Sequence, residues 1–244
     1  MIRGVVFDLG GTLIFPGDFE RGNAEALAGW LRARGFAVPE GFVEALIAER
    51  QRLWAERTGT EEVTADRALR AVLERYALPT DAAFLADAER AFFASELEAM
   101  RPLPGAAALL ARLARGGLRA GLISNASSHY LVVECCRRLL FAPYLDPILS
   151  SAGFGRTKPD PRIFHAILRQ WRLRPDETVM VGDSLSADVA GAAAAGMRSI
   201  WLTATLPPDA TAAQISARPD AVARSLLEVG EILDRWREEG GRHL

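Results

Sequence analysis

Residues 5–13 read Val5-Val6-Phe7-Asp8-Leu9-Gly10-Gly11-Thr12-Leu13, an apolar run that reaches an aspartate and then breaks at two glycines. This pattern predicts a buried strand followed by a turn. The same pattern returns far along the chain in Val179-Met180-Val181-Gly182-Asp183-Ser184-Leu185-Ser186-Ala187-Asp188. Because ligands bind beyond the carboxyl ends of parallel strands, we expect these carboxylates to meet at one sheet edge. Clustered carboxylates need a cation, so the sequence predicts a site for a hard metal ion.

Length and composition limit the class of protein. A chain of 244 residues forms one large domain or two smaller ones, and a hydrophobic content of 50% provides for a sizeable core. The chain has 29 Lys plus Arg against 31 Asp plus Glu, so charge gives no reason to expect a nucleic-acid partner. No apolar run is long enough to span a bilayer, so no membrane partner is expected either.

The first residues and the cysteines indicate a cytoplasmic setting. The segment Met1-Ile2-Arg3-Gly4 leads directly into the first predicted strand and lacks the regions of a signal peptide. The only cysteines, Cys135 and Cys136, are adjacent in sequence and unsuited to staple a fold. We therefore expect reduced thiols and a cytoplasmic location.

Short apolar runs alternate with helical segments over most of the chain. Strands are predicted at about 4–8, 118–124, 147–151, 178–182 and 198–202. Helices are predicted at 105–115, 125–139, from Asp160-Pro161 onward, 185–195 and 220–237. This alternation is typical of an α/β fold in which a Rossmann-like, doubly wound parallel sheet carries helices on both faces.

Residues 16–99 interrupt the alternation. They contain no convincing strand and instead predict helical segments near 20–34, 40–57, 62–76 and 81–99. The chain returns to the sheet at Arg101-Pro102-Leu103-Pro104-Gly105. We therefore expect a Rossmann-like core domain of residues 1–15 and 100–244, with an inserted helical cap domain of residues 16–99.

Polar residues follow the predicted strands at Asp8, Ser124-Asn125, Lys158, and Asp183 with Asp188. Taken singly, most of them could simply cap a turn or a helix. Lys158 is different because it directly precedes a predicted helix, where a cation opposes the helix dipole. An anion held between the lysine and the helix would explain its presence.

The order and spacing of these residues resemble the haloacid dehalogenase-like hydrolase superfamily, of the type with a helical (C1-type) cap after the first strand. The resemblance covers essentially the whole chain, and its motifs are Phe7-Asp8-Leu9-Gly10-Gly11-Thr12-Leu13, Ile123-Ser124-Asn125, Lys158-Pro159-Asp160-Pro161, and Gly182-Asp183-Ser184 through Asp188 into Gly191-Ala192 and Ala195-Gly196-Met197. It implies a hydrolase with a Rossmann-like core. For most members it also implies magnesium-dependent phosphoryl transfer from a small-molecule phosphorylated substrate.

The resemblance also implies a nucleophile and a metal site. Asp8 would attack phosphorus and form an aspartyl-phosphate, which water would then hydrolyse. Mg²⁺ would be held by Asp8, Asp183 and the carbonyl of Gly10. Asp188 would bind a water molecule of the metal or orient Lys158.

The same resemblance assigns the residues that bind the phosphate. Lys158 would neutralise its charge, and Ser124 would donate a hydrogen bond to one of its oxygens. The backbone around Gly11 and Thr12 could help to cradle it, and Asn125 is a further candidate for substrate binding.

Gly10 departs from the pattern of the family. In its phosphatases the residue two positions after the nucleophile is usually an aspartate, which protonates the leaving oxygen and later activates water. Glycine keeps the carbonyl ligand and loses the proton donor, and a positioned general acid typically contributes about 10²–10⁴-fold. His129 and Asp18 are speculative replacements. We therefore expect slow turnover of alkyl phosphates and faster turnover of aryl, acyl or anomeric phosphates.

Other functions stay open. A 2-haloacid dehalogenase also lacks the second aspartate, but it needs no metal, and Asp183 and Asp188 argue against it. Phosphonate hydrolysis would want a lysine from the cap, where residues 16–99 have none, and mutase activity relies on the missing acid. A binding or regulatory module on an inactive phosphatase fold would also lack the acid, but the intact nucleophile, lysine and metal carboxylates oppose it.

Overall fold

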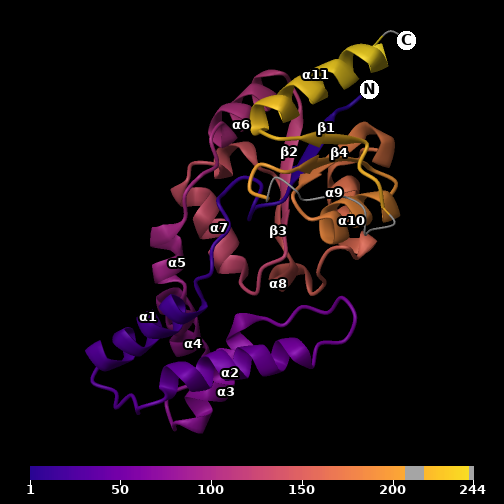
Figure 1. The fold of residues 1–244 in the computed structure, drawn as a ribbon. Helices are drawn as coiled ribbons and strands as arrows, with labels where there is room; N and C mark the ends of the chain where they lie inside the picture. The colour runs from indigo at the N-terminus through magenta and orange to yellow at the C-terminus, as the bar shows by residue number, and fades with distance from the viewer. Residues whose placement is uncertain (207–216, 242–244) are drawn as a thin grey trace.

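Parallel strands form the centre of the molecule in a computed structural model that describes residues 1–206 and 217–241. The six-stranded sheet has the order β3-β2-β1-β4-β5-β6 (Figure 1). Its strands are β1 (Gly4–Phe7), β2 (Arg119–Ser124), β3 (Ile148–Ser150), β4 (Thr178–Gly182), β5 (Arg198–Leu202) and β6 (Ala221–Ala223). This is the order of a doubly wound sheet, in which the winding reverses between β1 and β4. Ligands of such sheets bind at this reversal, beyond the strand ends.

Alternate residues of the strands pack on opposite faces of the sheet, as strand geometry requires. Val5 and Phe7 join the core beneath one set of helices, while Val6 and Met180 join a separate core on the other face. The first set is α6 (Ala106–Arg115), α7 (His129–Arg138) and α11 (Leu226–Gly241), and the second is α9 (Pro161–Trp171) and α10 (Ala190–Ala194). The predicted Rossmann-like α/β fold is therefore confirmed.

The helices between β1 and α6 gather beyond one end of the sheet, in the indigo to magenta part of Figure 1. They are α1 (Glu20–Ala33), α2 (Phe42–Ala55), α3 (Ala65–Arg75), α4 (Ala82–Phe92) and α5 (Ala94–Ala99). Their buried residues include Leu27, Leu46 and Leu69. The division into two domains at residues 15 and 99 stays a prediction.

Short helical elements connect the strands to the longer helices. They are α8 (Ser151–Phe154), the 3₁₀ turns η1 (Ala142–Tyr144) and η2 (Pro175–Glu177), and the π-helical turn η3 (Leu185–Val189). The predicted helix at 185–195 is therefore η3 followed by α10. The helix predicted from residue 125 begins at His129, where the Ser128 side chain accepts the Leu131 N–H.

The sequence pattern was wrong at two places. The predicted helix 81–99 is divided at Phe93, whose ψ of 3° departs from helical geometry. The predicted helix 220–237 begins only at Leu226, because Ala221–Ala223 forms β6 beside β5. Val222 fits the helical spacing of that segment, but it lies on this edge strand and is 52% exposed.

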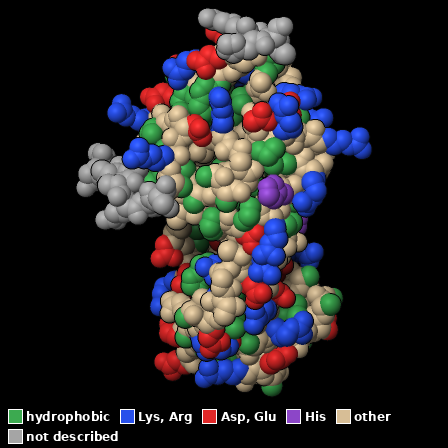
Figure 2. All heavy atoms as spheres, turned by 90° about the vertical axis from the view of Figure 1, so that its right-hand side faces the viewer, with side chains coloured by type: hydrophobic (Ala, Val, Ile, Leu, Met, Phe, Trp, Pro, Cys, Tyr) green, Lys and Arg blue, Asp and Glu red, His purple; other side chains and the backbone are tan. Residues whose placement is uncertain are grey.

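The surface mixes the two signs of charge. On the face shown in Figure 2, acidic and basic side chains lie among one another over both the upper and the lower parts. In the described parts of the chain, no helix combines the length and the apolar character needed to cross a bilayer.

Candidate active site

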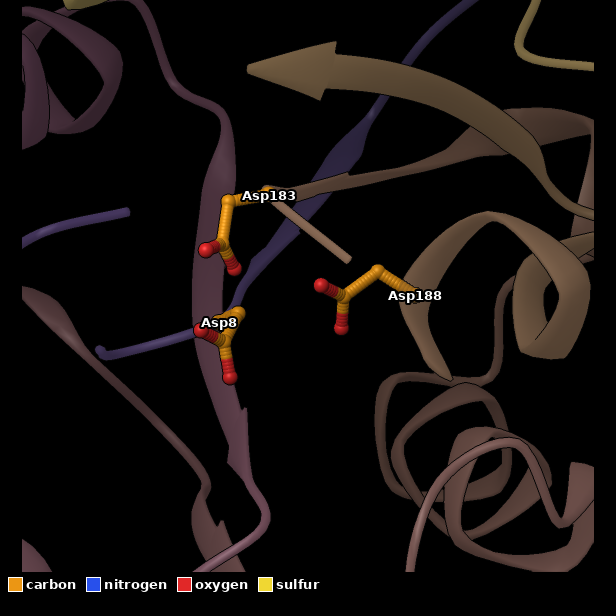
Figure 3. Close-up of side chains that lie close together, drawn as sticks. All are labelled: Asp8, Asp183 and Asp188. Carbon is orange, nitrogen blue, oxygen red and sulfur yellow. The ribbon is translucent and has the colours of Figure 1, made fainter. Parts of the chain in front are cut away.

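Three carboxylates meet beyond the ends of β1 and β4. Asp8 directly follows β1 and Asp183 directly follows β4, and the two strands pair with Phe7 beside Val181. Asp188 comes from η3, one helical turn after Asp183. Oxygen atoms of the three side chains lie within 4.8 Å of one another, and Figure 3 shows the carboxylates facing a common space.

Lys158 lies among these carboxylates. Its Nζ donates to Asp8 Oδ1 at 2.5 Å and to Asp188 Oδ1 at 2.6 Å, and the side chain is only 2% exposed. A third bond, to the carbonyl of Ile123 at 2.9 Å, fixes the ammonium at the end of β2. Burial alone would lower the pKa of Lys158, but the charges of Asp188 and Asp8 outweigh it and raise the pKa. The lysine therefore stays charged at neutral pH.

Among the described residues, Asp183 forms no ion pair of its own, because Lys158 pairs with Asp8 and Asp188. Burial raises its pKa to about 7, and the negative charges of Asp8 and Asp188 add to the effect. Three carboxylates facing one ammonium leave an excess of negative charge. A donor set of carboxylate oxygens with an uncompensated charge fits a hard divalent cation such as Mg²⁺.

Asp188 is held tightly in place. Its Oδ2 accepts the Ser184 N–H at 3.0 Å while Oδ1 accepts Lys158. The side chain lies against Gly182, where an added Cβ would be 2.1 Å from Asp188 Oδ2. Because residue 182 is a glycine, the Asp188 carboxylate can lie close enough to bond Lys158.

The turn after Asp8 bonds to itself. Gly11 N–H donates to the carbonyl of Ile14 at 2.9 Å, and Thr12 N–H donates to that of Leu9 at 3.3 Å. Thr12 is fully buried, and its Oγ1 has no hydrogen-bond partner among the described residues. In this conformation the two amides predicted to cradle a phosphate are thus used within the turn, and their role in binding stays a prediction.

Ser124 is the last residue of β2 and Asn125 follows it, but the two side chains have different surroundings. Ser124 is buried and lines the same cavity as Asp8. The side-chain amide of Asn125 forms two hydrogen bonds to the backbone of Lys158. Its Nδ2 donates to the Lys158 carbonyl at 3.1 Å, and its Oδ1 accepts the Lys158 N–H at 2.7 Å. Asn125 therefore positions the loop that carries the lysine, whatever part it has in substrate binding.

The cavity at this edge has a volume of about 360 Å³. Its lining includes Asp8, Gly10, Ser124, Lys158, Asp183 and Asp188, together with Glu96 of α5. Nothing in the sequence analysis singled out Glu96. The two speculative replacements for the missing acid lie elsewhere, because His129 Nδ1 pairs with Ser150 Oγ at 3.0 Å and Asp18 is an exposed residue before α1.

Comparisons with known proteins show which family this chain belongs to. The family model for haloacid dehalogenase-like hydrolases matches residues 2–196. A ribulose-1,5-bisphosphate 5-phosphatase of Halopiger xanaduensis is 31% identical over 96% of this chain and 99% of its own length. A phosphoserine phosphatase of Thermus thermophilus is 32% identical over 93% of this chain and 90% of its own. Among solved structures, a 2-haloacid dehalogenase from Pseudomonas syringae superposes with a TM-score of 0.77 at 31% identity, covering 97% of this chain and all (100%) of the other.

Proposed function

Because the chain belongs to the haloacid dehalogenase-like hydrolase family, we propose that it is a Mg²⁺-dependent phosphatase of a small-molecule phosphate monoester. Its hydrolase class follows from the family. The choice of a phosphate ester is supported by the phosphatases that resemble it over nearly its whole length. The observation that carries the proposal is the meeting of three carboxylates and one buried lysine in a single cavity.

The residues of the cavity suit phosphoryl transfer. Asp8 is the carboxylate nucleophile and takes the phosphoryl group. Lys158, charged and bonded to Asp8, meets the approaching phosphate with positive charge, and Ser124 donates a hydrogen bond to it. Mg²⁺ held by Asp8, Asp183, Asp188 and the Gly10 carbonyl would neutralise the remaining negative charge of the substrate.

Position 10 affects which substrates react well. Gly10 lines the cavity and offers no side chain to protonate a leaving oxygen. If no other residue supplies that proton, aryl, acyl or anomeric phosphates react faster than alkyl phosphates, whose leaving groups depend most on it. Equal rates on matched alkyl and aryl phosphates would show that another residue of the cavity donates the proton.

The test is hydrolysis of p-nitrophenyl phosphate by the purified protein with Mg²⁺ and with EDTA. Turnover with Mg²⁺, its loss in EDTA and its loss in Asp8→Asn are the expected results. The Asp18→Asn variant is the matched control, because Asp18 is exposed and lies outside the cavity lining. No turnover by the wild-type protein under any of these conditions would overturn the phosphatase proposal and leave the dehalogenase and the binding module, between which a metal-free haloacid assay chooses.

A 2-haloacid dehalogenase is the second candidate. The structural likeness to the Pseudomonas syringae dehalogenase and the glycine at position 10 favour it. The carboxylates of Asp183 and Asp188 beside Asp8 favour the metal-dependent phosphatase instead. Release of chloride from 2-chloropropionate in EDTA, with no turnover of p-nitrophenyl phosphate, would decide for the dehalogenase.

A further inference from the structure

The lining of the cavity includes a carboxylate from a helix outside the sheet. Glu96 belongs to the short helix α5, yet it lines the same cavity as Asp8, Ser124 and Lys158. It is half-buried there, and it lies within the helical segment that precedes the return to the sheet. The cavity thus presents both an expected nucleophile and a further carboxylic acid to a molecule bound in it.

We propose, on the basis of the phosphatase function proposed above, that Glu96 is the general acid and base that Gly10 cannot supply. In this role the carboxyl group of Glu96 would donate its proton to the leaving oxygen of a phosphate held at Asp8. This assigns to a helix outside the sheet the proton transfer that an aspartate in the turn after β1 would otherwise perform.

The contacts of Glu96 hold it ready for this role. Asn23 of α1 donates from Nδ2 to Glu96 Oε2 at 2.7 Å, and its Oδ1 accepts the Glu96 N–H at 3.2 Å. The first bond holds the carboxyl group against α1, and the second holds the backbone of Glu96. The other carboxyl oxygen, Oε1, receives no hydrogen bond from the described residues, and Glu96 lines the cavity.

The surroundings of Glu96 also suit a group that gives and takes a proton. Burial raises its pKa above the ordinary range, while the Asn23 hydrogen bond and the charge of Arg50 on α2 act in the opposite direction. The charge of Glu96 also acts on the thiol of Cys135 on α7. Burial raises the pKa of that thiol to about 12, so the thiol stays neutral. Among the described residues, Arg50 is therefore the charged group that acts on Glu96.

The two steps balance with Glu96 in this role. In the first, an oxygen of Asp8 bonds to phosphorus, the ester P–O bond breaks, and the leaving oxygen keeps the electron pair and takes the proton of Glu96. In the second, Glu96 takes a proton from water, the water oxygen bonds to phosphorus, and the bond to Asp8 breaks. Free alcohol and phosphate are released, with Asp8 and Glu96 restored.

The Glu96→Gln variant separates the two steps. Glutamine keeps an oxygen that can accept from Asn23, so the local structure is preserved while the proton is lost. With p-nitrophenyl phosphate, whose leaving group needs no proton, we expect a rapid burst of about one p-nitrophenolate per enzyme followed by turnover slowed about 10²-fold. With glycerol 2-phosphate, an alkyl ester, we expect no burst and a similar or larger loss of turnover.

Glu98→Gln is the matched control, because Glu98 lies on the same helix and is exposed. It should keep wild-type rates on both substrates. Adding Gly10→Asp to Glu96→Gln should restore turnover, since a Cβ at Gly10 meets no atom within 4 Å.

Two outcomes would overturn the assignment: wild-type turnover of both esters by Glu96→Gln, or loss of its burst together with its turnover. Failure of the phosphatase proposal itself would look different, because the wild-type protein would then show no Mg²⁺-dependent turnover.

Discussion

Gly10 and Gly11 are adjacent, but their surroundings differ sharply. A Cβ on Gly10 would lie in open space, whereas one on Gly11 would lie 2.1 Å from Asp183 Oδ2. Gly11 also has a φ of +76°, a conformation that residues with a side chain rarely adopt. The turn after Asp8 can therefore approach Asp183 closely only because residue 11 is a glycine.

We predict that alanine destabilises the protein at position 11 but not at position 10. Gly11→Ala should lower the melting temperature by about 2–10 °C, since backbone strain of about 1–3 kcal/mol combines with displacement of Asp183. It should also weaken Mg²⁺-dependent turnover. Gly10→Ala should leave the melting temperature within about 1 °C of wild type. Thermal unfolding of the two variants checks this, and equal destabilisation would contradict it.

The site was predictable at the residues that follow strands. Asp8, Ser124 and Asp183 each come directly after a buried run or at its end, and parallel strands bring such positions to one edge. Glu96 was not predictable, because in the segment Ala94–Ala99 it looks the same as Glu98. Only the packing of α5 against α1 turns one glutamate to the cavity and leaves the other in solvent.

At the scale of elements, the loop between α2 and α3 contacts the loop that carries Lys158. Thr60 accepts the Thr157 N–H at 2.8 Å, and its hydroxyl donates to Asp160 Oδ2 at 2.8 Å. Asp160 in turn caps α9 by accepting the Arg162 N–H. A segment far away in sequence thus braces the loop that presents Lys158.

We predict that Thr60→Val lowers the free energy of unfolding by about 1.5 kcal/mol, because it leaves Asp160 without one hydrogen bond. Thr58→Val is the matched control, since Thr58 is exposed in the same loop, and it should change stability by less than about 0.5 kcal/mol. Urea unfolding measures both. Similar values for the two variants would show that the brace adds nothing to stability.

Most elements could be predicted because their patterns are local. The strands next to the site are uninterrupted apolar runs, and the buried β4 is fully apolar apart from Thr178 and Gly182. β6 was missed because three residues at a sheet edge carry too little pattern to compete with the helix after them. A local signal for the true helix start existed: the Glu228 N–H donates to Ser225 Oγ, and the Glu228 side chain accepts the Arg224 N–H.

At the scale of the whole molecule, the carboxylate cluster links stability to pH and to metal. The pKa of an aspartate is about 4 in the unfolded chain, and burial raises the pKa of Asp183 to about 7 in the folded protein. Protonation of Asp183 therefore favours the folded state, and this contribution is fully present below pH 4. That contribution is lost as the pH rises through about 7, because the folded protein must then accept the added charge.

We therefore predict that, in EDTA, the melting temperature falls between pH 5 and pH 8, and that Mg²⁺ raises it more at pH 8 than at pH 5. Asp183→Asn should flatten the pH dependence and reduce the effect of Mg²⁺. Asp66→Asn, at an exposed position, should keep both. Differential scanning fluorimetry provides the measurement, and an effect of Mg²⁺ that is the same at both pH values would count against the linkage.

Lys158 is the only lysine in the sequence, and every other basic residue among the 29 is an arginine. Its side chain is 2% exposed between Asp8 and Asp188. Reagents that acylate or cross-link lysine amines thus find no side-chain target while the strand ends stay closed around it. Acylation of Lys158 by an N-hydroxysuccinimide ester, followed by mass spectrometry, would therefore report how often the centre of the cavity opens to solvent.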